Sequence, residues 1–173
     1  MGRKKKNANS SGKNNATNNS TVTIYTDGGA KPNPGKGGYG VVLRCRNKRK
    51  ELSGAYRATT NNRMEITAAI HGLEALTRPA TVVLYTDSRY LANAITKGWA
   101  YRWRRNGWMR NKEAPARNAD LWAKLLHLCD QHDVTFRWVR GHHECQENNR
   151  CDTLAANARG KLDVAIDHGF EKR

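Results

Sequence analysis

Two hydrophobic segments of this chain are nearly alike, TVTIYT at Thr21–Thr26 and TVVLYT at Thr81–Thr86, and an aspartate directly follows each of them. Both segments are rich in β-branched and aromatic residues, which favour β-strands. The second is a short apolar run, typical of a strand buried on both faces of a sheet. If the two strands are neighbours, Asp27 and Asp87 lie side by side at strand ends, where open α/β sheets build their sites.

The order of the other elements predicts the fold class. Strands at Thr21–Thr26, Tyr39–Arg46 and Glu51–Ala58 follow one another through a loop over 31–38 and a tight turn, as in an antiparallel meander. Helical periodicity then alternates with strands at Thr81–Thr86 and Val134–Val139, which implies parallel pairing. We therefore expect an α/β fold with a mixed five-stranded sheet, three antiparallel and then parallel strands, flanked by helices. The first helix is expected at about 62–78, beginning with an Asn62 cap, because Ile66, Ile70, Leu73 and Leu76 fall on one helical face. Further helices are expected at about 88–97, 118–132 and 150–159, with a polar loop over 141–149.

The charge of the chain indicates its kind of partner. Lys and Arg number 31 against 15 Asp and Glu, a formal net charge of +16. Five basic residues and no acid lie in residues 1–20, so the remainder still carries +11. A domain this basic favours nucleic acid or an anionic membrane as its partner, although an inert basic surface remains an alternative. Because no apolar run approaches the roughly 18 residues of a membrane span, and no signal-peptide core is visible, we expect a cytoplasmic protein without a membrane partner.

The chain divides into a tail and one domain. Residues 1–20 contain no large hydrophobe after Met1 and are expected to form a disordered basic arm. Residues 21–173 have a common size for a domain with one core. No heptad or large apolar stripe is visible, so we expect a monomer. The four cysteines form no C-x-x-C pair, and their spacing with His142 and His143 matches no common structural zinc pattern, so reduced thiols are expected.

Four acidic residues are candidates for a metal site. Asp27 and Asp87 follow strands, Glu65 lies near the start of a helix expected to pack on the sheet, and Asp152 lies in the helix after the last strand. Carboxylates at close range resist ionising together, and a divalent cation removes that penalty. Hard oxygen ligands suit Mg²⁺ or Mn²⁺, and four of them beside a basic surface suit two ions bridging a phosphate. The alternative is that these acids are helix caps and exposed ion pairs.

Several motifs carry a resemblance to a known family. The segments TVTIYTDGGAKPNPGKGGYG, TTNNRMEITAAIHGLEAL, VVLYTDSRYLANAI, NADLWAKL, FRWVRGHHE and ENNRCDTLA occur in this order, and the likeness extends from about residue 21 to about residue 170. Together they resemble type 1 ribonuclease H, in its bacterial single-domain form. The resemblance implies hydrolysis of the RNA strand of an RNA–DNA hybrid, leaving 5′-phosphate and 3′-hydroxyl ends. It also implies that Asp27, Glu65, Asp87 and Asp152 hold two Mg²⁺ ions when substrate is bound, with Mn²⁺ as a possible substitute, and that His142 assists proton transfer or product departure.

The same resemblance implies substrate contacts. The RNA 2′-hydroxyl would be read by the backbone near Gly28 and by Asn33 and Asn61, with Thr60, Asn62 and Arg89 as further candidates. The basic segment 97–117 resembles a protrusion that grips the DNA strand, with Trp99 against deoxyribose. Its candidate contact residues are Lys97, Trp99, Arg102, Trp103, Arg104 and Arg105. Alternatively Trp99, Trp103 and Trp108 form a small satellite core, and we expect at least one of them to do so, with Trp122 and Trp138 in the main core.

The sequence departs from the family pattern at two places, and two other functions remain as alternatives to ribonuclease H activity. Gly29 stands where the family commonly has serine, and the loop His143–Gln146 lacks the family's usual small residues, which bears on turnover and leaves the metal ligands untouched. A related transposase or resolvase type of DNA nuclease would share the sheet and the acids. A non-catalytic nucleic-acid-binding protein would share the charge, but four acids beside a bound phosphate would weaken its affinity.

Overall fold

The computed structural model describes residues 20–141 and 145–171, which fold around one five-stranded sheet in the order β3-β2-β1-β4-β5. The strands β1, β2 and β3 pair antiparallel, and β4 and β5 add to β1 in parallel, as predicted. The strands are β1 Val22–Ala30, β2 Gly35–Cys45, β3 Lys48–Thr59, β4 Thr81–Thr86 and β5 Asp133–Trp138. The helices are α1 Asn61–Glu74, α2 Arg89–Thr96, α3 Trp99–Arg105, α4 Ala119–Gln131, α5 Gln146–Arg159 and α6 His168–Glu171.

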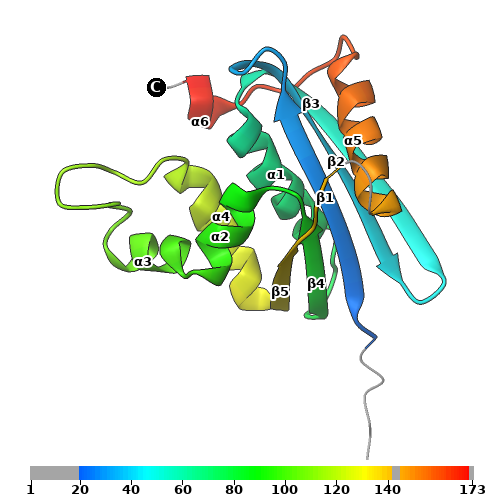
Figure 1. The fold of residues 1–173 in the computed structure, drawn as a ribbon, viewed down its shortest axis with the longest axis horizontal. Coiled ribbons are helices and arrows are strands. Elements are labelled where there is room, and N and C mark those ends of the chain that lie inside the picture. The colour runs from blue at the N-terminus through cyan, green and yellow to red at the C-terminus, as the bar shows by residue number, and fades with distance from the viewer. Residues whose placement is uncertain (1–19, 142–144, 172–173) are drawn as a thin grey trace, which may run out of the picture.

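The helices form a layer on each face of the sheet (Figure 1). α1 packs on β1 and β2, and α4 packs on α1. α5 packs across β1, β2 and β3 from the opposite face. α2 packs on β4, β5 and α1, and α3, which contacts α2 and α4, lies at the edge of the molecule (Figure 1). In the part of the chain that the structure describes, no helix is long and apolar enough to cross a membrane.

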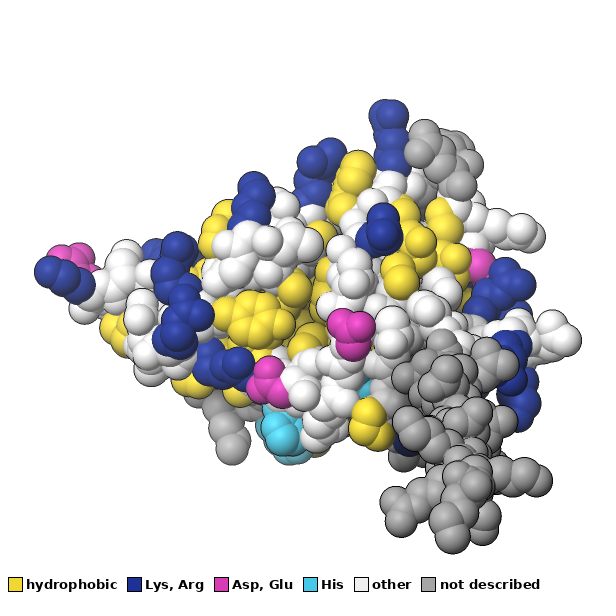
Figure 2. Space-filling view, turned by 90° about the horizontal axis from the view of Figure 1, so that it is seen from below, with side chains coloured by type: hydrophobic (Ala, Val, Ile, Leu, Met, Phe, Trp, Pro, Cys, Tyr) yellow, Lys and Arg dark blue, Asp and Glu magenta, His cyan; other side chains and the backbone are white. Residues whose placement is uncertain are grey.

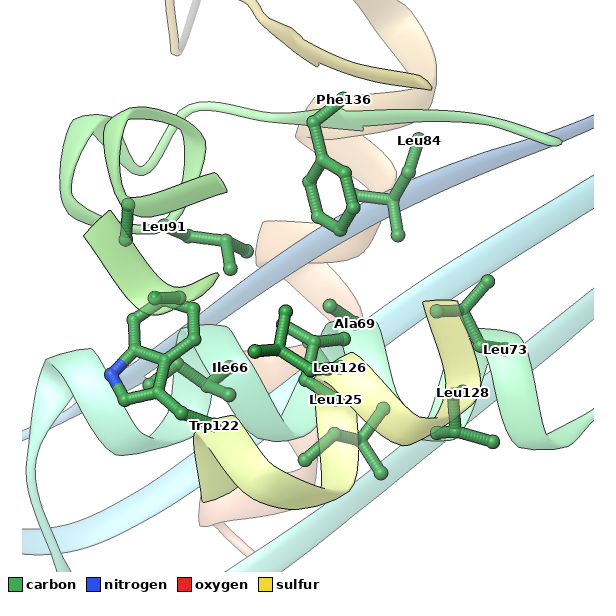
Figure 3. Packing of buried hydrophobic residues seen from close by; sticks show 14 of the residues in the cluster. Ile66, Ala69, Leu73, Leu84, Leu91, Trp122, Leu125, Leu126, Leu128 and Phe136 are labelled. Atoms are coloured by element: carbon green, nitrogen blue, oxygen red, sulfur yellow. The ribbon is translucent and has the colours of Figure 1, made fainter. Parts of the chain in front are cut away.

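The main core lies between the sheet and the helices α1, α2 and α4 (Figure 3). Ile66 and Leu73 of α1 meet Leu84 of β4 and Leu125 of α4, and all four side chains are fully buried. Their spacing in α1 is that of one helical face, so the predicted period places them together. Trp122 is fully buried in this core, as expected, and its ring contacts the ring of Trp103 edge to face with centroids 6.0 Å apart.

Several element boundaries differ from those predicted. β1 continues past Asp27 to Ala30, and β2 begins at Gly35 within the predicted loop. α1 is capped by Thr60, whose hydroxyl accepts the Arg63 amide, so Asn62 is not the cap, and the helix ends at Glu74. α5 begins at Gln146, whereas a loop was expected there. The first turn of α5 has a polar sequence without an apolar period, so it was not predicted as a helix. Glu147 in this turn is held by ion pairs to β2 and β3.

Two glycines let helices approach the sheet backbone from opposite faces. A Cβ atom at Gly28 in β1 would lie 2.5 Å from the Met64 carbonyl group in α1. A Cβ atom at Gly40 in β2 would overlap the carbonyl oxygen of Cys151 in α5. Real Cβ atoms do not come so close to backbone, so these two positions require glycine. The helices that carry Glu65 and Asp152 are therefore seated directly on the strands beside Asp27.

Candidate active site

The parallel pairing of β1 with β4 brings Asp27 and Asp87 together. Thr26 lies opposite Thr86 in the register, so the residue after each of them emerges at the same level of the sheet. The Thr26 hydroxyl donates to the Tyr85 carbonyl oxygen at 3.3 Å, a further link between the two strands. The predicted juxtaposition is confirmed, although Asp27 lies inside β1 rather than beyond its end.

α1 and α2 bring Glu65 to the same place. The backbone of Met64 and Glu65 packs on Gly28, one residue after Asp27. The Ser88 hydroxyl donates a hydrogen bond to the Glu65 carboxylate, and the same oxygen accepts the Leu91 amide at 3.1 Å, capping α2. Ser88 therefore fixes Glu65 against the start of α2. Sequence reasoning placed Ser88 at a helix start and missed this second role.

Asp152 reaches the site from the other side of the sheet, in the second turn of α5. The neighbouring Cys151 is fully buried, and its thiol donates to the Tyr25 carbonyl oxygen at 3.2 Å, which anchors this turn to β1. The charge of Asp152 acts on Asp27. The other three predicted acids thus lie near enough to Asp27 for their charges to act on it, and the four come from two strands and two helices.

The electrostatics of this cluster are those of buried carboxylates that repel one another. Burial, followed by the negative charge of Asp87, raises the pKa of Asp27 to about 8, and the charges of Asp152 and Glu65 act in the same direction. The Gly28 amide opposes this by donating to Asp27 Oδ1 at 2.7 Å. Burial also raises the pKa of Glu65 to about 7, against the hydrogen bond from Ser88, with the charge of Asp87 adding to the rise. A bound cation would relieve both penalties.

The donor set suits hard divalent ions. It consists of carboxylate oxygens, which Mg²⁺ and Mn²⁺ prefer, and all four carboxyl-bearing residues are half-buried rather than sealed from solvent. Among residues 20–141 and 145–171, no three His, Cys, Asp or Glu side chains close around a single point. Mg²⁺ in proteins usually keeps several waters and is bound by one or two carboxylates together with substrate phosphates.

Trp138 and Gly141 flank Asp87. The Trp138 indole N–H donates to the Asp87 backbone carbonyl oxygen at 2.9 Å, and the Arg89 guanidinium lies 4.1 Å from the centre of its ring. Trp138 is 40% exposed, so the prediction that it belongs to the core is wrong. Its position lets the indole N–H reach a hydrogen-bond acceptor at the end of β4. Gly141 packs against the Asp87 carboxylate. His142 lies outside the described residues.

The predicted substrate-contacting residues at the start of α1 form a linked group. Asn33 Oδ1 accepts the Asn61 amide at 3.1 Å, and Asn61 Oδ1 accepts the Ala30 amide at 2.7 Å. Both side chains therefore hold the loop after β1 against α1. Thr60 caps the helix, and Asn62 is exposed beside it. These residues border the same end of α1 as Glu65.

The predicted basic protrusion is formed by α3 and the loop after it, where Lys and Arg side chains gather at the left end of the molecule (Figure 2). Trp103 is buried, as expected for one of the three tryptophans. Trp99 is half-buried, with the Lys97 ammonium 5.3 Å from its ring centre. Arg104 pairs with Asp130 at 2.7 Å, while the other predicted phosphate contacts in α3, Arg102 and Arg105, are exposed.

Comparisons with known proteins agree with this geometry. The model of the RNase H family matches residues 19–159. Ribonuclease H of Syntrophus aciditrophicus is 60% identical over 149 residues, which cover 86% of each chain. Among solved structures, LC9-RNase H1, described as a type 1 RNase H with the type 2 active-site motif, has a TM-score of 0.73 at 29% identity, over 88% of this chain and 80% of that one. LC11-RNase H1, solved in complex with RNA/DNA hybrid, shares the fold with a TM-score of 0.60 at 24% identity, over 80% of this chain and 96% of that one. The chain therefore belongs to the RNase H family, as a type 1 ribonuclease H of the bacterial kind.

Proposed function

We propose that this chain is an endoribonuclease that hydrolyses the RNA strand of RNA–DNA hybrids and leaves 5′-phosphate and 3′-hydroxyl ends. The observation that carries the proposal is the grouping of carboxylates around Asp27, whose pKa is raised by burial and then by the charge of Asp87. Family membership supplies the reaction class.

The four acids, Asp27, Glu65, Asp87 and Asp152, would hold two divalent ions, Mg²⁺ or in its place Mn²⁺. When bound, such ions supply a nucleophilic water and neutralise charge on the phosphate. Ser88 orients the Glu65 carboxylate by its hydrogen bond. The Gly28 amide, which donates to Asp27 Oδ1 at 2.7 Å, fixes the other central carboxylate. His142 would carry a proton to or from the reacting phosphate.

Substrate choice would depend on two regions. Asn33 and Asn61, together with the backbone at Gly28, would read the 2′-hydroxyl that only RNA offers, assisted by Thr60, Asn62 and Arg89. Their side-chain oxygens are engaged with backbone amides, which leaves the amide NH₂ groups to donate to substrate. The protrusion would bind the DNA strand through its phosphates, with Trp99 against a sugar. The candidate contacts there are Lys97, Trp99, Arg102, Trp103, Arg104 and Arg105; Trp103 is buried and would act through the packing of α3.

The quaternary state and the domain division are part of the proposal. Among the described residues, the exposed large hydrophobic side chains are those of Trp138, Leu162 and Ile166. They offer too little apolar surface for a stable dimer, so the protein would act as a monomer with residues 21–173 as its catalytic domain and 1–20 as a basic arm. Sedimentation at micromolar concentration should give a single species of 19.5 kDa.

The test uses four end-labelled substrates: RNA–DNA hybrid, duplex RNA, duplex DNA and single-stranded RNA. Each is incubated with Mg²⁺, with Mn²⁺ and with EDTA, beside an Asp87→Asn variant. We expect metal-dependent cleavage of only the RNA strand of the hybrid, abolished in the variant. Cleavage of duplex DNA would instead identify a DNA nuclease, and binding of the hybrid without cleavage under either metal would identify a non-catalytic binder.

A further inference from the structure

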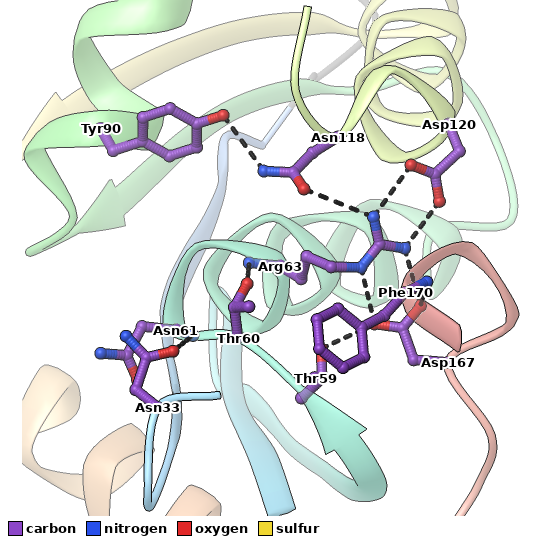
Figure 4. A network of polar contacts seen from close by, with 10 residues as sticks. All are labelled: Asn33, Thr59, Thr60, Asn61, Arg63, Tyr90, Asn118, Asp120, Asp167 and Phe170. Atoms are coloured by element: carbon purple, nitrogen blue, oxygen red, sulfur yellow. Dashed lines mark hydrogen bonds and ion pairs between the residues drawn. The ribbon is translucent and has the colours of Figure 1, made fainter. Parts of the chain in front are cut away.

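Arg63 carries a buried charge in the first turn of α1. Its side chain is 1% exposed, and it lies between the candidate substrate-binding residue Asn61 and the candidate metal ligand Glu65. The guanidinium forms a two-point pair with Asp167, Nε to Oδ2 and Nη2 to Oδ1, both at 2.7 Å. A second pair joins it to Asp120, with Nη1 to Oδ1 at 2.9 Å and Nη2 to Oδ2 at 2.6 Å (Figure 4).

Such a network fixes geometry more than it stabilises the fold. Taking the charges of Arg63 and Asp167 out of water has a cost that offsets much of their attraction, while the Asp120 side chain remains partly exposed. Two-point pairing with a planar guanidinium, in contrast, sets both distance and orientation. Arg63 is held this way on two sides, so the first turn of α1 has a defined position relative to α4 and to the C-terminal end of the chain.

The C-terminal partner belongs to a segment that runs along the edge of the sheet. This segment, residues 165–171, is called here the C-terminal strap. Ala165 donates its amide to the Ala55 carbonyl oxygen at 2.8 Å and accepts the Arg57 amide at 3.0 Å, which docks the strap on β3. Asp167 also accepts the Thr59 hydroxyl at 2.6 Å. Gly169 then closes over the network, since a Cβ atom there would overlap Asp120 and the Arg63 guanidinium.

On its other side, the same turn of α1 meets the loop after β1. Asn61 accepts the Ala30 amide at 2.7 Å, and its own amide donates to Asn33 at 3.1 Å. Figure 4 shows the two sets of contacts side by side on the start of α1. Contacts therefore run without a break from the strap through Arg63 to the residues proposed to read the RNA strand.

We infer that Arg63 is a positioning residue for hybrid recognition, and that the C-terminal strap, through Asp167, holds the substrate-reading turn of α1 in place. This inference rests on the proposed function. Loosening the strap displaces Asn61 and Asn33 relative to the minor groove. It leaves the protrusion, which binds phosphates of any duplex, where it is. The consequence is a loss of preference for hybrid over duplex DNA rather than a general loss of binding.

The experiment compares Asp167→Asn with Glu171→Gln in the full chain. Both remove a negative charge from the strap, but Glu171 pairs with exposed Arg57 of β3 at 2.6 Å, whereas Asp167 pairs with Arg63 of α1. Dissociation constants for hybrid and for duplex DNA are measured by fluorescence anisotropy in an Asp87→Asn background, and KM and kcat are measured with Asp87 present. Asp167→Asn should weaken hybrid binding and raise KM about fivefold, the effect of roughly one lost hydrogen bond, with duplex DNA binding and kcat nearly unchanged. Glu171→Gln should match the parent protein.

A second variant perturbs the network without changing charge. Gly169→Ala pushes the strap away from Arg63, and it should lower the preference for hybrid in the same direction as Asp167→Asn. All assays are run well below each variant's unfolding temperature, so that loss of folded protein does not enter. An unchanged ratio of hybrid to DNA affinity in both variants, or equal losses for the two ligands, would overturn the inference. If the parent protein cleaves no hybrid, the proposed function itself fails, which is a separate result.

Discussion

The Trp138 indole N–H donates to the Asp87 backbone carbonyl oxygen at 2.9 Å, so an exposed tryptophan on β5 restrains the main chain of a candidate metal ligand on the neighbouring strand. Because β4 and β5 run parallel and Thr86 lies opposite Trp138, the bond forms just where β4 ends. Asp87 lies one residue beyond the end of β4, and its backbone is held there by the hydrogen bond from Trp138.

Replacing Trp138 with phenylalanine should therefore lower activity more than stability. The ring and its contact with Arg89 remain, but the hydrogen bond to Asp87 is lost, and one hydrogen bond contributes about 1 kcal/mol. We expect kcat to fall about fivefold with little change in KM, while the unfolding temperature drops by only a few degrees. Steady-state kinetics and thermal unfolding on the same preparation check this. Unaltered kcat would show that the bond does not restrain the ligand.

Replacing Asp27 with asparagine should abolish cleavage and stabilise the metal-free protein. Burial, with repulsion from Asp87 next, disfavours the charged form of Asp27, as its raised pKa of about 8 indicates. The amide removes that cost, so the unfolding temperature in EDTA at neutral pH should rise by roughly 5 °C, the equivalent of about 1–2 kcal/mol for a chain of this size. Exposed Asp133 provides the control, since Asp133→Asn should leave the unfolding temperature nearly unchanged. A variant Asp27→Asn no more stable than the control would contradict the electrostatic account.

The Arg63 network should make stability depend on acid pH. Burial raises the pKa of Asp167, but hydrogen bonds from Arg63 and Thr59 outweigh it and hold the pKa below the usual range; the bond from Arg63 likewise lowers the pKa of Asp120. An acid with a lowered folded-state pKa contributes stability that is complete above the unfolded value of about 3.9 and is lost as pH falls through the folded value. Urea unfolding from about pH 5 to about pH 2.5 should show this loss, and Asp167→Asn should flatten the curve. An equally steep curve in the variant would exclude Asp167 as a source of the slope.

The protrusion should show a graded dependence on individual arginines. Arg102, Arg104 and Arg105 are all exposed, but Arg104 is engaged by Asp130 at 2.7 Å and lies over Tyr101. Each exposed arginine that meets a phosphate releases about one counterion. Hybrid affinity measured against salt concentration should lose about one unit of slope in Arg102→Ala or Arg105→Ala, and clearly less in Arg104→Ala. Equal slopes for the three variants would mean that the ion pair opens when substrate binds.

The sequence predicted the parts of the fold that depend on hydrophobic pattern. The strand Thr81–Thr86 and the face of Ile66 and Leu73 are as expected, because burial alone determines both. The first turn of α5 was missed because it is held by charge: Glu147 contacts Arg44 at 3.2 Å and Arg49 at 2.9 Å, partners about a hundred residues away that no local period reveals.

In the candidate site, too, some features could be predicted from the sequence and others depend on contacts between distant residues. The positions of Asp27 and Asp87 are consequences of strand order and could be predicted. The supporting contacts could not, because Ser88 to Glu65 and Trp138 to Asp87 join side chains or backbone across elements without any spacing rule. The first strand was predicted to end at Thr26, yet β1 continues through Gly28, where the backbone of α1 packs too close for a side chain.

The contact between Gly28 and the backbone of α1 also has a consequence for how constant the site is. Where layers meet through side chains, their spacing varies with rotamer, with thermal motion and with every substitution in the core. Here strand and helix meet main chain to main chain, and a backbone has one thickness. The separation between the backbones that carry Asp27 and Glu65 is therefore set by this direct contact. Substitutions or increased thermal motion elsewhere in the core should therefore leave this backbone separation unchanged.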